Sequence, residues 1–270
     1  MKAKDFEFDG RTLSSFGMVL CKFDSGGIDT IDGVKVTFNT VSTLNGLKHY
    51  ATSTQYEDCL ETTLQICKYS CNDDIREISS TEYRELTKWL ARKKFLKLKI
   101  LDEDYIDLYF EASFNINRIE LNGKLYGLEL EVTTNRPYAL KEPKTIIIEN
   151  TSKNGKYSIN DVSYEEGYIY PYTEITIGNV DDLLSSQENV LTIYNALEDR
   201  VTEIKGVTSG EVITMDYPVI NFTNPSHTYT DFNWTFFRIA NSYYNSRNDL
   251  TISIPCTIKF KYSPIVKVGM

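Results

Sequence analysis

Histidine, tryptophan and cysteine are scarce in this 270-residue chain, which contains two histidines, two tryptophans and five cysteines. His49 and His227 lie far apart and belong to no metal-binding motif, so we expect no histidine-based metal site, no catalytic triad and no cofactor. The glycine-rich motifs that bind nucleotide phosphates are missing as well. Acidic runs such as Asp102-Glu103-Asp104 are better explained as turns than as paired catalytic acids. The sequence therefore predicts that the protein is not an enzyme.

Basic residues are in deficit, because 29 Lys and Arg stand against 38 Asp and Glu and give a formal net charge of −9. Nucleic-acid binding requires clustered positive charge, so we expect no sequence-specific nucleic-acid partner. No run approaches the ~20 apolar residues of a membrane span, which predicts no membrane insertion. The first residues lack the apolar segment of a secretory signal, and the cysteine count is odd. Both features favour synthesis in a reducing cytoplasm.

Alternation of apolar and polar residues dominates the chain. It is clear at residues 62–67 and 95–100 in the first half, and at 190–193 and 212–215 in the second. A period of two predicts strands with one buried face, so the fold class is mainly β. Asn122-Gly123 lies between two alternating segments and predicts a tight hairpin turn.

One segment, residues 80–94, has the pattern of a helix instead. Ser79 followed by Glu82 three residues later forms a capping box, and basic residues gather at the far end. Apolar residues recur at helical spacing in Tyr83, Leu86 and Leu90. The sequence predicts a single helix that lays this stripe on a sheet.

A domain boundary is indicated where Pro137 and Pro143 bracket a short polar stretch, because proline interrupts central strands. We expect a first domain at residues 1–138 and a second at 139–270. The short strands and regular turn signals of the second domain are typical of a β-sandwich. Residues 256–268 either complete that domain or return to the first.

Aromatic residues are plentiful in the second half of the chain. Aromatic faces stack on sugar rings, so Tyr168, Tyr170 and Trp234 are candidate carbohydrate contacts. For Trp234 the sequence favours burial over sugar contact, since alternation places it on one face of a strand together with Phe232 and Phe236.

Several segments, in order along nearly the whole chain, resemble one known family. They are Phe6-Glu7-Phe8-Asp9-Gly10, Ser14-Ser15-Phe16-Gly17-Met18, Lys88-Trp89-Leu90, and residues 147–155, 171–179, 210–216, 248–252 and 260–269. The family is that of the distal tail proteins of long-tailed, siphovirus-type phages that infect Gram-positive bacteria.

The resemblance implies a β-sandwich-like N-terminal domain with one α-helix, which associates into a homo-hexameric ring, followed by a galectin-like β-sandwich. It also implies a structural hub at the tail tip or baseplate of the virion, synthesised in the host cytoplasm. The expected partners are the tail tube protein and a tail-associated lysin or fibre-bearing, receptor-binding protein. The alternative function is a carbohydrate-binding module that acts in adsorption to the host surface.

Contacts between ring subunits are expected from loops and strand edges of the first domain. The candidate interface residues are Gly26, Gly27, Asn45, Gly46 and Leu47. Asn45-Gly46 predicts a hairpin whose arm pairs with the sheet edge of a neighbour, or else an ordinary internal hairpin. The acidic charge is expected to line the lumen of such a ring and to repel DNA.

Overall fold

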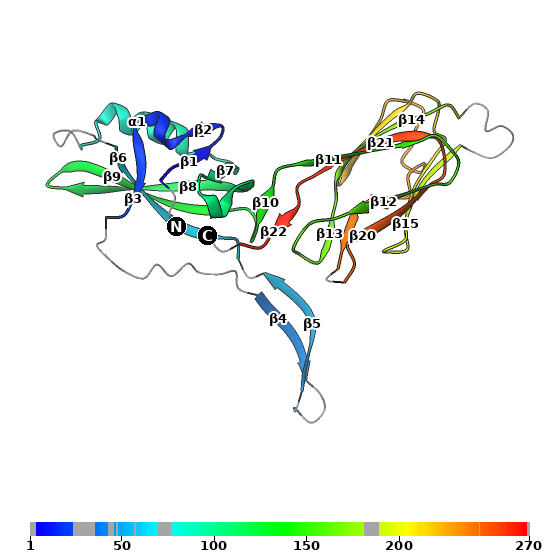
Figure 1. The fold of residues 1–270 in the computed structure, drawn as a ribbon, viewed down its shortest axis with the longest axis horizontal. Helices are drawn as coiled ribbons and strands as arrows, with labels where there is room; N and C mark the ends of the chain where they lie inside the picture. Colours follow the sequence, from blue (N-terminus) through cyan, green and yellow to red (C-terminus); the bar gives the residue numbers. More distant parts are fainter. Residues whose placement is uncertain are drawn as a thin grey trace. The chain divides into compact units, whose positions relative to one another are not determined.

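The chain folds into two compact units, each with its own hydrophobic core (Figure 1). The structure is a computed structural model, and it describes residues 4–23, 36–42, 46, 48–56, 58–69, 77–180, 189–242 and 244–268. Unit 1 consists of Met1–Lys141 and Val266–Met270, and unit 2 consists of Glu142–Ile265. Strands predominate in both units, which confirms the mainly β class.

Unit 1 is built on a nine-stranded sheet. Seven of its strands follow the order β2-β1-β7-β8-β9-β6-β3, and β10 pairs with β8 and β22. The strands are β1 (Phe6–Phe8), β2 (Arg11–Thr12), β3 (Met18–Cys21), β6 (Glu61–Lys68), β7 (Leu96–Ile100), β8 (Leu108–Leu121), β9 (Lys124–Thr134), β10 (Ala139–Lys141) and β22 (Ile265–Val266).

Turn chemistry sets the register of the central hairpin, β8–β9. Asn122 and Gly123 both adopt positive φ values, 51° and 75°, as the predicted two-residue turn requires. Leu128, Leu130 and Val132 are therefore placed on one face of β9, where all three are buried. Between β7 and β8 the chain forms a short 3₁₀ helix, η2 (Glu103–Tyr105), and a second one, η1 (Leu13–Phe16), follows β2.

The predicted helix is present as α1 (Ser80–Leu90), the one α-helix of the described residues. The Glu82 N–H donates to Ser79 Oγ, and the Ser79 N–H donates to Glu82 Oε2, so the capping box is complete. The helix ends before the predicted limit of residue 94, because Ala91 leaves the helical region with ψ at 85°.

One face of α1 packs on the unit 1 sheet (Figure 1). Leu86, Trp89 and Leu90 are buried there, whereas Tyr83 is only partly buried. The Trp89 indole stacks on Phe16 with ring centroids 4.4 Å apart. Its Nε1–H donates to a backbone carbonyl of β1 over 2.9 Å, so the buried indole keeps a hydrogen-bond partner.

Unit 2 is a β-sandwich, as predicted. A five-stranded sheet has the order β11-β21-β14-β17-β18, a four-stranded sheet has the order β12-β20-β15-β16, and β13 pairs with β19. The strands are β11 (Lys144–Asn150), β12 (Gly155–Asn160), β13 (Gly167–Ile169), β14 (Tyr172–Ile177), β15 (Val190–Asn195), β16 (Arg200–Lys205), β17 (Val212–Asp216), β18 (Val219–Phe222), β19 (Ile239–Asn241), β20 (Arg247–Ile252) and β21 (Cys256–Tyr262).

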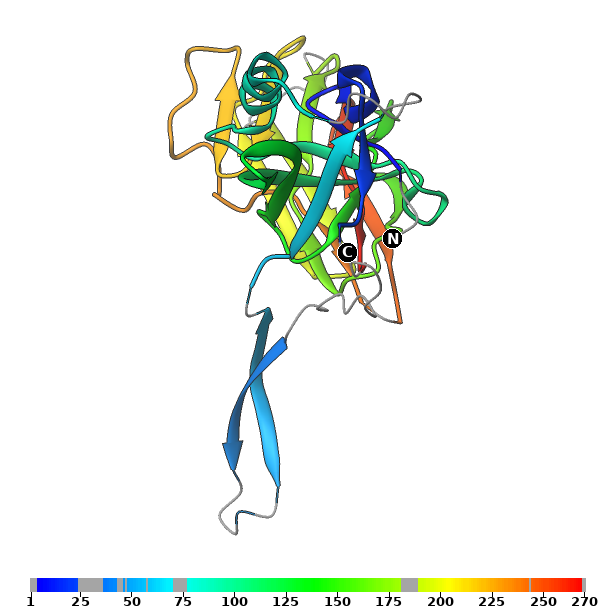
Figure 2. The same ribbon diagram turned by 90° about the vertical axis from the view of Figure 1, so that its left-hand side faces the viewer.

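The remaining two strands, β4 (Val36–Ser42) and β5 (His49–Tyr56), form a separate two-stranded sheet. Figure 2 shows them as a long ribbon twisted about its own axis. A register shift between Asn39 and Thr40 interrupts the pairing, and such an irregularity increases the local twist.

Candidate assembly hairpin and aromatic surface

The β4–β5 hairpin exposes nearly all of its side chains. Neither strand pairs with any other strand in the part of the chain that the structure describes. The exposed side chains include four large apolar or aromatic ones, namely Val36, Phe38, Val41 and Tyr50. Phe38 is the most exposed of them, at 60%. A hairpin of this length with unsatisfied apolar surface is typical of a segment that binds a partner.

Of the predicted interface residues, the structure describes Gly46. Gly46 is in the connection between β4 and β5 and adopts a left-handed φ of 64°, which glycine tolerates without strain. Gly26, Gly27, Asn45 and Leu47 lie outside the described residues, so their role in an interface stays a prediction.

An apolar groove of about 610 Å³ lies beside strand β3 of unit 1. Its walls come from β3, the end of β6 and the β8–β9 hairpin, and its apolar members include Val19, Phe23, Ile119 and Leu121. Phe23 and Leu121 are among the exposed large hydrophobic residues. Because β3 is an end strand of the sheet order, the groove adjoins a sheet edge.

The expected burial of Trp234 beside Phe232 and Phe236 is wrong. Phe232 and Phe236 are buried, but Trp234 is 51% exposed. The segment is not a strand, because Trp234 adopts a left-handed φ of 56° and breaks the alternation. Its Nε1–H donates to the backbone carbonyl of Tyr229 over 3.1 Å, which fixes the indole.

Trp234 belongs to a continuous series of ring contacts on unit 2, here called the aromatic surface. Its members, in order of contact, are Tyr168, Tyr170, Tyr217, Phe236, Trp234 and Tyr229. Tyr170 and Tyr217 are stacked with centroids 4.1 Å apart, and Tyr229 and Trp234 are stacked at 6.0 Å. The structure thus connects all three predicted sugar contacts, and it adds Tyr217 and Tyr229, which no sequence pattern singled out.

An ion pair borders one end of the aromatic surface. The Arg238 guanidinium lies 3.9 Å from the ring centroid of Tyr168 and pairs with both carboxylate oxygens of Glu198. The hydrogen bond that Arg238 donates to Glu198 raises the pKa of Arg238, so this guanidinium stays charged. Arg238 and Glu198 together therefore add no net charge at this end of the aromatic surface.

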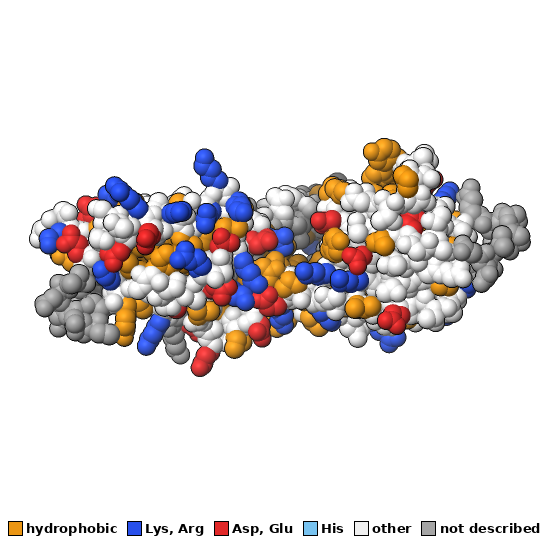
Figure 3. All heavy atoms as spheres, turned by 90° about the horizontal axis from the view of Figure 1, so that it is seen from above, with side chains coloured by type: hydrophobic (Ala, Val, Ile, Leu, Met, Phe, Trp, Pro, Cys, Tyr) orange, Lys and Arg blue, Asp and Glu red, His pale blue; other side chains and the backbone are white. Residues whose placement is uncertain are grey.

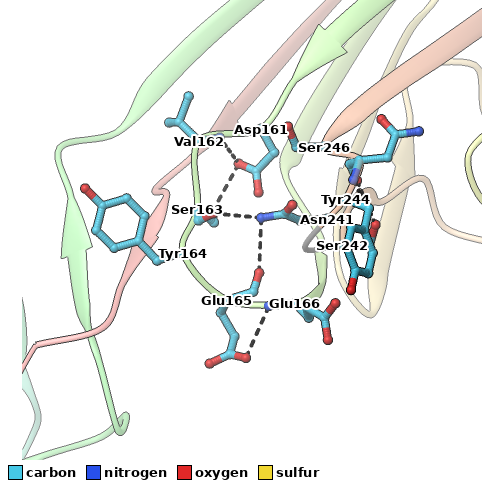
Figure 4. A pocket seen from close by; sticks show the side chains of 11 residues that line it. Asp161, Val162, Ser163, Tyr164, Glu165, Glu166, Asn241, Ser242, Tyr244 and Ser246 are labelled. Atoms are coloured by element: carbon cyan, nitrogen blue, oxygen red, sulfur yellow. Dashed lines mark hydrogen bonds between the residues drawn. The ribbon is translucent and has the colours of Figure 1, made fainter.

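A polar pocket of about 410 Å³ lies elsewhere in unit 2, between the loop after β12 and the turn between β19 and β20 (Figure 4). Asp161 is buried in its wall, and one oxygen accepts hydrogen bonds from the Val162 N–H and the Ser163 hydroxyl. Asn241 ties the loop down by donating to two backbone carbonyls, those of Ser163 and Glu165. Asp161 and Asn241 therefore hold the loop after β12 in place, which accounts for polar side chains in this pocket.

The described residues contain no cluster of three or more His, Cys, Asp or Glu side chains that could hold a metal ion. None of the described helices is long and apolar enough to cross a membrane. Acidic and basic side chains are intermixed over unit 1 on the face seen in Figure 3.

Two family models together match almost the entire chain. Residues 1–136 match a model described as the phage tail protein N-terminal domain, and residues 138–262 match the phage tail C-terminal domain. The chain therefore belongs to this family of phage tail proteins, whose place is in the tail of the virion. No curated protein matches the sequence.

Among solved structures, the fold is similar to that of the SPP1 Dit (gp 19.1) protein, described as a paradigm of the hub adsorption apparatus in Gram-positive infecting phages. The TM-score is 0.61 at 10% sequence identity, and the match covers 97% of this chain and 99% of the other. The chain thus has the two-domain fold of a distal tail hub protein.

Proposed function

We propose that the protein is a structural hub of the tail tip, in which six copies close into a ring. The ring joins the tail tube to the tail-associated lysin or receptor-binding apparatus and has no catalytic role. Family membership and the shared fold with a hub protein support this proposal. The single structural observation that supports association of the subunits is the exposed β4–β5 hairpin.

The hairpin supplies the physical reason for association. An isolated two-stranded sheet is only marginally stable in water, and this one leaves Phe38, Val41 and Tyr50 exposed. Full burial of one large apolar side chain contributes about 1.5–3 kcal/mol. A neighbouring copy that covers these side chains stabilises both the hairpin and the ring.

The acceptor in this proposal is the groove beside β3 on the next copy. The groove offers apolar walls from Val19, Ile119 and Leu121 next to a sheet edge, and these can cover the apolar side chains of the hairpin. Hairpin and groove are different surfaces of one chain, so the contact is head-to-tail. Repeated head-to-tail contacts form a closed ring when the rotation per subunit divides a full turn.

Light scattering coupled to size-exclusion chromatography tests this assignment. We expect Phe38→Asp in the hairpin and Leu121→Asp in the groove each to shift the protein from hexamer to monomer, because each places a charge in an apolar contact. The matched control is Gln55→Asp, which adds the same charge at an exposed polar position of β5. Hexamers that persist in both apolar variants would refute the hairpin-and-groove contact.

A further inference from the structure

The aromatic surface of unit 2 exposes only aromatic side chains that carry a polar group. Tyr168, Tyr217, Tyr229 and Trp234 are each more than half exposed, with Tyr229 at 82%. Tyrosine and tryptophan combine an apolar ring face with a hydroxyl or N–H at the edge. Such side chains match a ligand that also has apolar faces and polar edges.

The exposed rings are held in place before any ligand binds. Phe236 is buried and contacts both Tyr217 and Trp234 edge-on, with centroid distances of 5.3 Å and 6.4 Å. Tyr170 is stacked against Tyr217 with an interplanar angle of 7°. The left-handed φ of Trp234 costs backbone energy, and residues under such strain cluster at binding sites. Preorganised rings avoid the entropy cost of ordering side chains on binding.

The ion pair that borders the Tyr168 end of the surface favours a neutral ligand. Arg238 and Glu198 satisfy each other through two hydrogen bonds of 2.8 Å and 2.9 Å. An anionic polymer would have to compete with the Glu198 carboxylate for the guanidinium. A neutral sugar has C–H faces that stack on the rings and hydroxyls that hydrogen-bond at their edges, without displacing the pair.

We propose that the aromatic surface binds a neutral polysaccharide, with Tyr217, Trp234 and Tyr229 stacking on the sugar rings. This goes beyond the hub function, because binding is placed in unit 2 and needs neither the hairpin nor the ring. The candidate contacts Tyr168 and Tyr170 contribute differently. Tyr168 extends the surface, and Tyr170 supports Tyr217 through the stacked contact.

Affinity electrophoresis of the full-length protein tests the proposal. The native gels contain hydroxyethyl cellulose, a neutral glucose polymer, or soluble glycol chitin, a polymer of N-acetylglucosamine, and parallel gels contain anionic polygalacturonate. We expect a neutral polymer to retard the wild type more than polygalacturonate does. Trp234→Ala and Tyr217→Ala should each weaken the interaction roughly tenfold, the effect of losing one stacked ring.

Two further variants keep the result interpretable. Tyr229→Ala removes a largely exposed ring and leaves the backbone carbonyl that holds the indole, so it tests the surface without disturbing the fold. Tyr244→Ala is the matched control, because Tyr244 is 99% exposed on unit 2 and lies outside the ring series. We expect it to bind as the wild type does.

Fluorescence gives an independent readout. The chain has two tryptophans, and Trp89 is buried in unit 1, so a polysaccharide-dependent change in emission reports on Trp234. The proposal is overturned if no neutral polymer retards the wild type, or if the three ring variants bind as Tyr244→Ala does. Oligomeric state, measured on the same samples, reports separately on the hub function.

Discussion

His227 Nε2 lies 2.9 Å from Glu211 Oε1 in unit 2, and both side chains are almost wholly enclosed, at 3% and 1% exposure. The second oxygen of Glu211 accepts a hydrogen bond from the Thr208 N–H, and Phe222 stacks on the imidazole with centroids 4.3 Å apart. His227 belongs to the loop that leads to the aromatic surface, and Glu211 directly precedes strand β17. Their contact therefore holds this loop against the start of β17.

We expect His227→Gln to lower the free energy of unfolding by about 1–3 kcal/mol, because it leaves a buried Glu211 oxygen without the imidazole nitrogen that lies 2.9 Å from it. The double variant His227→Gln with Glu211→Gln should be more stable than the single one, since two amides can bond to each other. Urea unfolding followed by fluorescence measures both. Equal losses in the single and double variants would show that the contact between His227 and Glu211 contributes nothing.

Asp231 is expected to make the loop sensitive to acid. Hydrogen bonds from Thr228, above all its backbone N–H, and the nearby His227 lower the pKa of Asp231 below its ordinary value of 3.8. A lowered folded-state pKa contributes stability that is present above the unfolded pKa and lost as the pH falls through the folded one. Asp231→Asn should therefore flatten the decline in stability below about pH 4. Urea unfolding at a series of pH values measures this. An equal loss of unfolding free energy below pH 4 in Asp231→Asn and the wild type would contradict the prediction.

The capping box of α1 predicts a local stability effect. Ser79→Ala removes the side chain that accepts from the Glu82 N–H and should cost about 1 kcal/mol of unfolding free energy. Ser80→Ala, one residue into the helix, is the control and should be nearly neutral. Thermal unfolding of both variants measures the difference, and equal midpoints would rule out a contribution from the cap.

Burial should protect Cys256 from thiol reagents. Desolvation raises the pKa of this thiol to about 12, so little thiolate forms at neutral pH. Cys59 is exposed and should react before Cys256. Mass spectrometry of peptides after brief treatment with iodoacetamide tests the order, and equal labelling of Cys59 and Cys256 in the folded protein would refute it.

Local patterns predicted the parts of the fold that depend on neighbours in sequence. The capping box at Ser79 places the start of α1 correctly, and Asn122-Gly123 places the β8–β9 turn, because both signals act within a few residues. The sequence placed the end of α1 at residue 94, four residues too far, since no glycine or proline follows Leu90 directly.

Contacts between distant segments account for what the sequence did not predict. Alternation suggested a buried Trp234, but a left-handed backbone at that residue turns the indole outward, and no local pattern reports such a φ. His227 and Glu211 meet only because the loop after β18 folds back to the start of β17, so the sequence did not link these two residues. Tyr217 joins the aromatic surface in the same way, through residues remote in the chain.

Native mass spectrometry of the full-length wild-type protein is the most direct test of the hub assignment. We expect a dominant species at six times the mass of the chain, which dissociates into monomers when the Phe38→Asp substitution is made. A wild-type protein that stays monomeric at every concentration would contradict the ring.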